Sequence, residues 1–415
     1  MPLASKNSNV LKRGLLKYFT VTNGVLPSYV QSMDVHRLTL LHFSVSGLVI
    51  LNEPPLADAQ HFINFIYAHQ IPPSIEYNTE RCGFRGSSFI GAPLQLDANN
   101  ISKYSPLPYD SCHVTMNYSA LVSLLVLGDD LERVNRQAVI DGIKALQYVN
   151  GNLINGSLFC PEFDARFIFS AVASAYILDM LEQLDLDEFE KFLINSITYE
   201  GAFGSLPKLE AHAGLTYCAL ASLKLMNRLE RVLPHGSLQR EKLVNWLVCR
   251  QNGGFNGRSQ KDADTCYTFW VGASLRMLSA DRYVDKVSLL KFICSTYDPI
   301  VGGFMKSPDA NNVDLLHSYL TLAGLSCLFK NPSSADSANS TSIQLADSLD
   351  KLHLDETAIN DLVTQLDHLV VNDLRPLVPE LNLPVDAFQR LMEIHARWRS
   401  SPSRSAASKC LLPTE

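Results

Sequence analysis

A carboxylate, a thiol and an imidazole between residues 264 and 317 could together hold a metal ion. Asp264 and Cys266 are two residues apart, and His317 follows later in the chain. All three groups bind Zn²⁺, and three protein ligands leave the fourth tetrahedral position open, as in catalytic zinc sites. Residues i and i+2 do not face each other in a regular helix, so Asp264 must lie at or before a helix start. The pattern predicts an open zinc site, although an Asp-x-Cys pair with a distant histidine also arises often by chance.

Four further polar side chains near this set could bind an anion. Arg258 and Lys261 precede the carboxylate–thiol pair, Tyr267 follows it, and His212 lies about 50 residues earlier. Arginine and lysine bind phosphate oxygens, and a tyrosine hydroxyl can donate a hydrogen bond to a leaving oxygen. These residues therefore predict a phosphate-like anion beside the metal, whereas the alternative for the two cations is a solvated loop.

A sequence repeat must position these side chains. Turns made of glycine and an aromatic or aliphatic residue recur, and from the second turn onward they are about 50 residues apart. The turns are Gly83-Phe84, Gly151–Leu153, Gly201–Phe203, Gly254-Phe255 and Gly303-Phe304. A long apolar segment and then an amphipathic one follow each turn, which predicts stacked helical hairpins. The expected fold is all-α, an α/α toroid with the apolar helices inside and the amphipathic helices outside.

An acidic residue opens each of five apolar segments, as an N-cap that accepts backbone N–H groups of the first helical turn. These expected caps are Asp110, Asp164, Glu210, Asp264 and Asp314. The five segments begin at equivalent points of the repeat. The side chains just past the caps should therefore meet at one rim of the ring. They are His113, Arg166, His212, Cys266 and His317. Such a coincidence favours a functional site over five separate structural side chains.

The composition fits a large globular protein and argues against some functions. Of 415 residues, 47% are hydrophobic and 19% are charged, with a net charge of −7 and a pI of ≈ 5.9. A general nucleic-acid-binding face is therefore not expected. The nine cysteines are scattered singly, and we find neither a secretory signal nor an apolar run of bilayer length. We expect a cytoplasmic protein without a transmembrane segment.

The repeat stops near residue 331, which suggests three regions. We expect a toroid core over residues 1–331, an acidic and partly disordered insertion over 332–379, and a terminal helix that docks back, followed by a frayed tail, over 380–415. Between Asp336 and Asp373 the chain has eight acidic residues and one lysine. Helical periodicity within this stretch predicts a solvated acidic helix.

Five long motifs run through residues 39–328, and the sequence LMEIHARW follows near the end. The motifs are RCGFRGSSFIG, LGDDLERVN, EAHAGLTYCALASL, GRSQKDADTCYTFWVGASL and HSYLTLAGLS. Together they resemble the β subunits of protein prenyltransferases, most closely those of type I geranylgeranyltransferases. The resemblance implies an α/α barrel that pairs with a helical α subunit. It also implies transfer of geranylgeranyl from its diphosphate to the cysteine thiol of C-terminal CaaX motifs, with leucine preferred as X, on small GTPases and similar proteins.

The resemblance also assigns roles to residues. Asp264, Cys266 and His317 would hold one zinc ion that activates the peptide thiol. The residues implied to bind diphosphate are His212, Arg258, Lys261, Tyr267 and Lys306. Those implied to line the lipid and peptide pocket are Thr39, His113, Arg166, Phe167, Leu316 and Leu320.

Two of these positions bear on which prenyltransferase the chain resembles. Thr39 replaces a bulky tryptophan of farnesyltransferases, which leaves room for a C20 chain. Lys306 replaces an aspartate that engages magnesium, so magnesium is not expected to be required.

Two residues depart from the type I pattern. Leu320 stands where an aromatic residue is usual, and Thr115 stands where an alanine is usual. The alternatives are a Rab-type geranylgeranyltransferase or farnesyltransferase β subunit and, in another class, a non-catalytic helical-toroid docking module.

Overall fold

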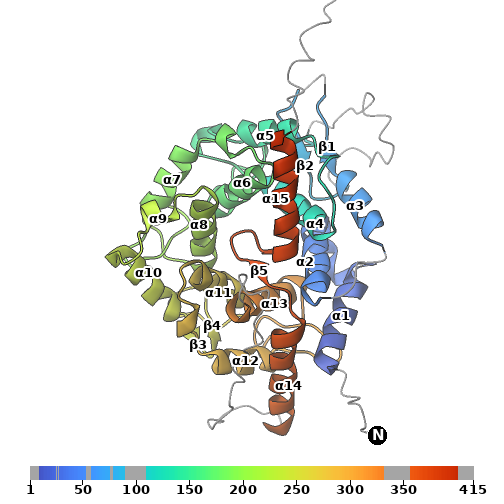
Figure 1. Ribbon diagram of the computed structural model, residues 1–415, viewed down its shortest axis with the longest axis vertical. Helices are drawn as coiled ribbons and strands as arrows, with labels where there is room; N and C mark the ends of the chain where they lie inside the picture. Colours follow the sequence, from blue (N-terminus) through green and yellow to red (C-terminus); the bar gives the residue numbers. More distant parts are fainter. Residues whose placement is uncertain are drawn as a thin grey trace, which may run out of the picture.

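The computed structural model describes residues 9–24, 26, 28–52, 58–74, 78–88, 109–330 and 356–400. Six apolar helices form a closed inner ring in which each packs against the next, and the last packs against the first (Figure 1). They are α2 (Arg37–Ile50), α4 (Val114–Val126), α6 (Ala165–Ile177), α8 (Ala213–Leu225), α11 (Tyr267–Met277) and α13 (Leu315–Phe329). The expected α/α toroid is confirmed. Helix α2 is a sixth inner helix that the five predicted segments did not include, because no glycine turn of the repeat precedes it.

Amphipathic helices surround the inner ring (Figure 1). They are α1 (Val10–Thr22), α3 (Ala59–Tyr67), α5 (Arg136–Ala145), α7 (Leu186–Asn195), α10 (Leu238–Val248) and α12 (Lys286–Ser295). Short helical segments complete the connections: η1 (Ser28–His36), η3 (Val149–Gly151), η4 (Leu181–Gln183), α9 (Leu229–Val232) and η5 (Asp281–Tyr283). Within the described residues, no helix is both long enough and apolar enough to cross a bilayer.

The glycine–aromatic turns join the outer layer to the inner one. Two of them are antiparallel strand pairs, β1 (Gln70–Ile71) with β2 (Gly83–Phe84), and β3 (Gln251–Asn252) with β4 (Gly254–Phe255). The aromatic side chains that follow the glycines are fully or almost fully buried: Phe84, Phe203, Phe255 and Phe304. Polar side chains of the inner helices accept the backbone N–H of three of these phenylalanines: Asn117, Thr216 and Ser318. The repeated motif thus supplies an apolar anchor and satisfies its backbone at the same time.

Side-chain caps hold the starts of the inner helices at one rim. As predicted, Asp164 caps α6 and Asp314 caps α13. Asp264 lies just before α11, where its Oδ1 accepts the N–H of Cys266 at 2.9 Å.

Two predicted caps are wrong. Helices α4 and α8 are capped by His113 and His212, whose Nδ1 atoms accept backbone N–H groups two residues ahead. Asp110 instead pairs with Arg85 in the interior at 3.1 Å, and Glu210 pairs with Arg258 at 3.0 Å. A histidine can replace an acidic cap because its unprotonated ring nitrogen is also a hydrogen-bond acceptor.

The predicted acidic helix within residues 332–379 exists but is not solvated on all sides. Helix α14 (Glu356–His368) buries Ile359, Val363 and Leu366 against the core and packs on α1 and α12. The spacing of three to four residues between these side chains makes one apolar stripe, which explains the docking. The part of this stretch before α14, up to residue 355, lies outside the described residues. The division of the chain at residues 331 and 379 stays a prediction.

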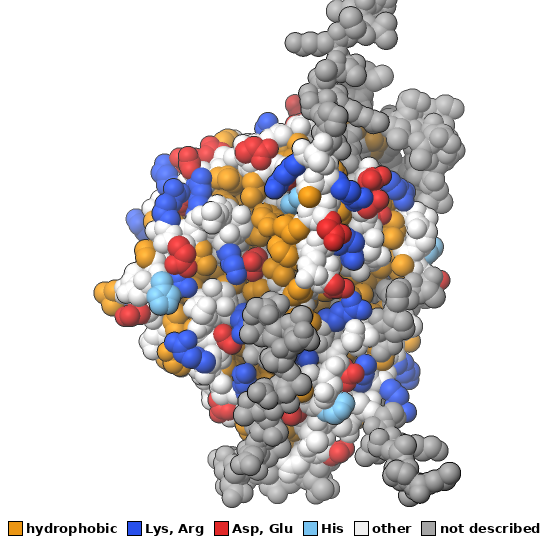
Figure 2. Space-filling view, in the orientation of Figure 1, with side chains coloured by type: hydrophobic (Ala, Val, Ile, Leu, Met, Phe, Trp, Pro, Cys, Tyr) orange, Lys and Arg blue, Asp and Glu red, His pale blue; other side chains and the backbone are white. Residues whose placement is uncertain are grey.

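The C-terminal segment crosses one end of the ring (Figure 1). It follows a π-helical turn, η6 (Leu369–Asp373), and consists of the hairpin β5 (Leu377–Val378) and β6 (Leu383–Pro384) and then helix α15 (Val385–Ser400). Arg390 donates to the carbonyl of Leu125 at 2.6 Å, and His395 Nε2 lies 3.0 Å from the carbonyl of Ile177. Helix α15 is therefore tied to the ends of α4 and α6. On this face, Figure 2 shows Lys, Arg, Asp and Glu interspersed, with no broad basic patch among the described residues.

We predict that His42 makes the fold sensitive to acid. This side chain is 2% exposed on α2, and burial lowers its pKa to about 4 from an ordinary value near 6.5. The neutral form is therefore favoured in the folded state. Its contribution to stability is present above about pH 6.5 and is lost as the pH falls toward 4, by up to about 3 kcal/mol. Urea unfolding at pH 7.5 and 4.5 should show a smaller acid-induced loss for His42→Phe than for wild type. Equal losses would contradict the assignment.

Candidate functional site

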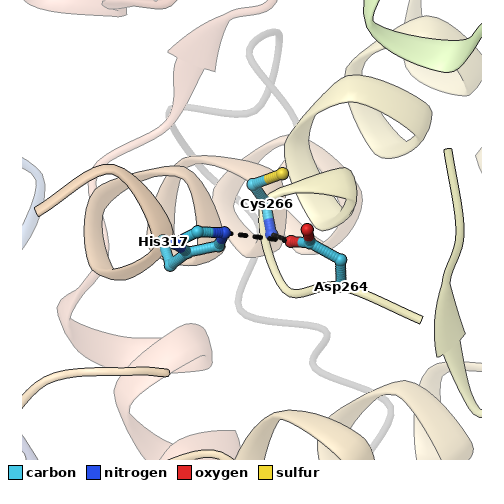
Figure 3. Close-up of side chains that lie close together, drawn as sticks. All are labelled: Asp264, Cys266 and His317. Atoms are coloured by element: carbon cyan, nitrogen blue, oxygen red, sulfur yellow. Dashed lines mark hydrogen bonds and ion pairs between the residues drawn. The ribbon is translucent and has the colours of Figure 1, made fainter. Parts of the chain in front are cut away.

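Asp264, Cys266 and His317 come together at the rim of the ring (Figure 3). One potential ligand atom from each lies within 4.8 Å of the others. His317 Nε2 is 3.3 Å from Asp264 Oδ1, and all three side chains are largely buried. Asp264 and Cys266 precede α11 and His317 lies in the first turn of α13, so the ring brings two neighbouring helix starts into contact. The placement of Asp264 before the helix agrees with the spacing argument.

Asp314 orients the imidazole of this group. Its Oδ2 lies 2.6 Å from His317 Nδ1, while its Oδ1 accepts the backbone N–H of His317 at 2.9 Å. Nε2 is thereby directed toward Asp264. A carboxylate that holds the far nitrogen of a ligating histidine fixes its tautomer and raises its basicity.

The protonation of the group depends on whether a cation is bound. Burial and the adjacent Asp264 raise the pKa of the Cys266 thiol well above its ordinary value. Burial alone would lower the pKa of His317, but the Asp264 and Asp314 carboxylates raise it to about 9. Without a cation the thiol therefore keeps its proton, whereas a divalent ion would favour the thiolate and the neutral imidazole. The soft sulfur, the imidazole and the carboxylate together fit zinc.

The structure brings two of the predicted anion-binding side chains into contact and gives a third another partner. Tyr267 Oη lies 3.1 Å from His212 Nε2. Arg258 is paired with Glu210, a partner that the sequence did not indicate. Lys261 is exposed, and the Lys306 carbonyl accepts the N–H of Thr265 at 3.0 Å. Convergence of all five side chains on one anion stays a prediction.

A cavity of about 1120 Å³ opens inside the ring next to the metal-ligating group. All six residues predicted for the pocket line it: Thr39, His113, Arg166, Phe167, Leu316 and Leu320. His317 lines it as well, so the candidate metal group and the cavity are continuous. Its other walls include the aromatic rings of Phe43, Tyr118, Phe169, Tyr217, Phe269 and Trp270. A largely apolar cavity of this size can take a long hydrocarbon chain.

The C-terminal hairpin closes one end of this cavity, which the sequence did not predict. Tyr118, Tyr217 and Tyr319 lie on three different inner helices. Their hydroxyls donate to the carbonyls of Leu381, Pro379 and Asn382 at 3.0, 2.9 and 3.5 Å. Asn382 itself lines the cavity. The hairpin lies outside the repeat, so periodicity gave no signal for it.

A family model described as "Prenyltransferase alpha-alpha toroid domain" matches residues 10–383, most of the chain. The chain belongs to the prenyltransferase family. The match includes the candidate metal group, the cavity and the closing hairpin.

Named relatives of this prenyltransferase agree with the resemblance seen in the motifs. Geranylgeranyl transferase type-1 subunit beta of Dictyostelium discoideum is 40% identical over 318 residues, covering 75% of this chain and 89% of the relative. The protein of the same name from Arabidopsis thaliana is 33% identical over 340 residues, covering 78% and 87%. The expected kinship with type I β subunits of protein prenyltransferases is confirmed.

A solved structure supports the fold of this prenyltransferase. Candida albicans protein geranylgeranyltransferase-I complexed with GGPP matches with a TM-score of 0.69 and 22% sequence identity, covering 92% of this chain and 98% of that chain. At 22% identity, this match supports only the toroid fold.

We predict that Asp314→Ala weakens zinc binding about 10- to 100-fold, because His317 loses the carboxylate that orients it. Asp285→Ala is a matched control, since Asp285 likewise caps a helix, α12, at a site away from the metal group. Both variants should lose about 1 kcal/mol of stability from the missing cap. Zinc affinity measured by chelator competition should fall only in Asp314→Ala, and equal affinities in the two variants would refute the orienting role.

Proposed function

We propose that the protein is the catalytic β subunit of a heterodimeric protein geranylgeranyltransferase type I in the cytoplasm. It transfers geranylgeranyl from geranylgeranyl diphosphate to the cysteine thiol of C-terminal CaaX motifs, with leucine preferred as X. The observation that carries the proposal is the position of His317, which belongs to the metal-ligating group and also lines the apolar cavity. A nucleophile held at that group would lie beside a hydrocarbon chain in the cavity.

The proposed reaction exchanges one bond to carbon for another. The peptide thiol loses its proton to solvent, and a sulfur electron pair forms the bond to C1 of the isoprenoid. The C1–O bond breaks, and its electron pair leaves with diphosphate. Zinc held by Asp264, Cys266 and His317 would lower the pKa of the peptide thiol, so that thiolate is available at neutral pH. One zinc ion per β subunit is sufficient for this role.

The leaving diphosphate would be stabilised by polar side chains near the candidate metal group, since Tyr267 directly follows Cys266. Tyr267 and His212 already form one hydrogen-bonded pair. Arg258, Lys261 and Lys306 would add positive charge where negative charge develops on the leaving oxygens. With Lys306 in this set, we expect the reaction to proceed without magnesium.

The cavity would select the donor by its length. Thr39 lines the cavity, and its hydroxyl lies 3.5 Å from Met116 Sδ. A small side chain there leaves space for the fourth isoprene unit, and each additional buried methylene contributes about 0.8 kcal/mol. His113 and Leu316 also line the cavity and would lie near the X residue of the peptide.

We predict that Cys266→Ala abolishes both zinc binding and prenyl transfer in the complex with the α subunit. Removal of one of three ligands leaves too few donors to hold the ion. Cys294→Ala is a matched control, because Cys294 is also buried but lies on the outer helix α12. Metal analysis and transfer to a CaaL peptide should separate the two variants. Full transfer by Cys266→Ala would refute the proposed zinc site.

We also predict that the enzyme prefers geranylgeranyl to farnesyl diphosphate when both compete for a CaaL peptide, with or without magnesium. Thr39→Trp should reverse the preference, because the indole fills the space of the last isoprene unit. The product ratio measured by mass spectrometry reports both results. Preference of the wild type for farnesyl diphosphate would favour a farnesyltransferase, and zinc-free complexes without transfer would favour a docking module.

A further inference from the structure

Tyr267 lies at the rim beside the candidate metal group. It is the first residue of α11, directly after Cys266, and its hydroxyl reaches across to His212 on the neighbouring inner helix. Its oxygen lies 3.1 Å from His212 Nε2. Either the phenol or the imidazole can be the donor in this hydrogen bond. If the imidazole donates, the phenolic hydrogen remains available for another acceptor.

The backbone at the start of α8 determines which of the two groups is the donor. The N–H of Gly214 points at His212 Nδ1 at 3.1 Å. A backbone amide can only donate, so Nδ1 accepts and carries no proton. Burial, and after it the nearby Arg258, lowers the pKa of His212, so the ring is neutral and its proton is on Nε2. His212 therefore donates to the Tyr267 oxygen, and the phenolic hydrogen is free to be donated to another acceptor.

Gly257 gives the Tyr267 ring its position. A Cβ at Gly257 would lie 2.2 Å from both Cζ and Oη of Tyr267 and 2.6 Å from Cε1. The φ of Gly257 is not positive, so the backbone itself would accept alanine, and the collision with the ring is the obstacle. The carbonyl of Gly257 also accepts the N–H of Ala213 at 2.8 Å, which fixes the turn against the start of α8.

We propose that Gly257 is a positioning residue that allows the Tyr267 hydroxyl to lie where it can donate to the leaving diphosphate. Nε2–H of His212 donates to the phenol oxygen, which leaves the phenolic hydrogen for another acceptor. The missing side chain of Gly257 provides the space in which the ring lies. This inference rests on the proposed function for the identity of the leaving group, but the placement of Tyr267 by Gly257 does not.

The test compares Gly257→Ala, Tyr267→Phe and the double variant in the zinc-loaded complex with the α subunit. Tyr267→Phe should lower the single-turnover rate on the order of a hundredfold, as loss of a hydrogen bond made to the leaving charge does. Gly257→Ala should lower it by a similar factor, with the KM for the prenyl donor changed less than about threefold. The double variant should be no slower than Tyr267→Phe, within about threefold, because the displaced hydroxyl is already absent.

Gly254→Ala is the matched control for the collision itself. A Cβ at Gly254 would lie 2.2 Å from Cδ1 of Phe292 on the outer helix α12, which is as close as the contact in Gly257→Ala but does not involve Tyr267. Its φ is not positive either. Gly254→Ala should lower the melting temperature and leave the single-turnover rate per folded enzyme within about twofold of wild type. Zinc content should stay at one per complex in every variant.

Crystal structures of the wild-type and Gly257→Ala complexes test the placement independently of activity. In Gly257→Ala the Tyr267 hydroxyl should have left hydrogen-bond distance of His212 Nε2. The inference would be overturned if the hydroxyl had not moved. It would also be overturned if the rate of the double variant fell by the product of the two single-variant factors. If the wild type transfers no prenyl group at all, the proposed function fails, while the pair of structures still decides whether Gly257 places Tyr267.

Discussion

Closure of the inner ring is the constraint on which the rest of the structure depends. Each inner helix packs against two inner neighbours, and α13 packs against α2 to complete the circle. The four glycine–phenylalanine turns fix the height at which α4, α8, α11 and α13 begin, since their phenylalanines are buried. Residues at equivalent positions of the repeat therefore lie at the same rim, whatever their separation in the chain. Ligands from α11 and α13 can meet around one point because those helices are adjacent in the circle.

The same constraint shapes the electrostatics of the rim. The inner helices begin there, and each helix start carries a partial positive charge from its unpaired N–H groups. Side-chain caps satisfy part of this potential, and in α4 and α8 the caps are neutral imidazoles instead of carboxylates. The starts of α4 and α8 therefore keep a positive potential that no capping carboxylate offsets, although Asp164 caps α6 between them. The carboxylates of Asp264 and Asp314 favour a cation where α11 and α13 begin.

Much of this arrangement could be predicted from sequence because it follows from repetition. The phase of the repeats placed Cys266 and His317 at one rim, and the Asp-x-Cys spacing required Asp264 to precede its helix, as it does. Features outside the repeat could not be predicted in this way. The ring membership of α2 and the closing hairpin depend on tertiary contacts that leave no period in the sequence. The histidine caps were missed because an acidic residue stood two or three positions earlier and fitted the usual preference.

The hairpin at the end of the ring has a consequence for how the molecule is made. The hydrogen bonds from Tyr118, Tyr217 and Tyr319 to this hairpin span 263, 162 and 63 residues. During synthesis from the N-terminus, the six inner helices leave the ribosome before the segment that closes their cavity. A nascent chain that ends at α13 still lacks residues 377–384, which close one end of the cavity. Such long-range closure is slow compared with the formation of local helical hairpins. Until it is complete, the apolar lining is exposed to water and to any chaperone that recognises it.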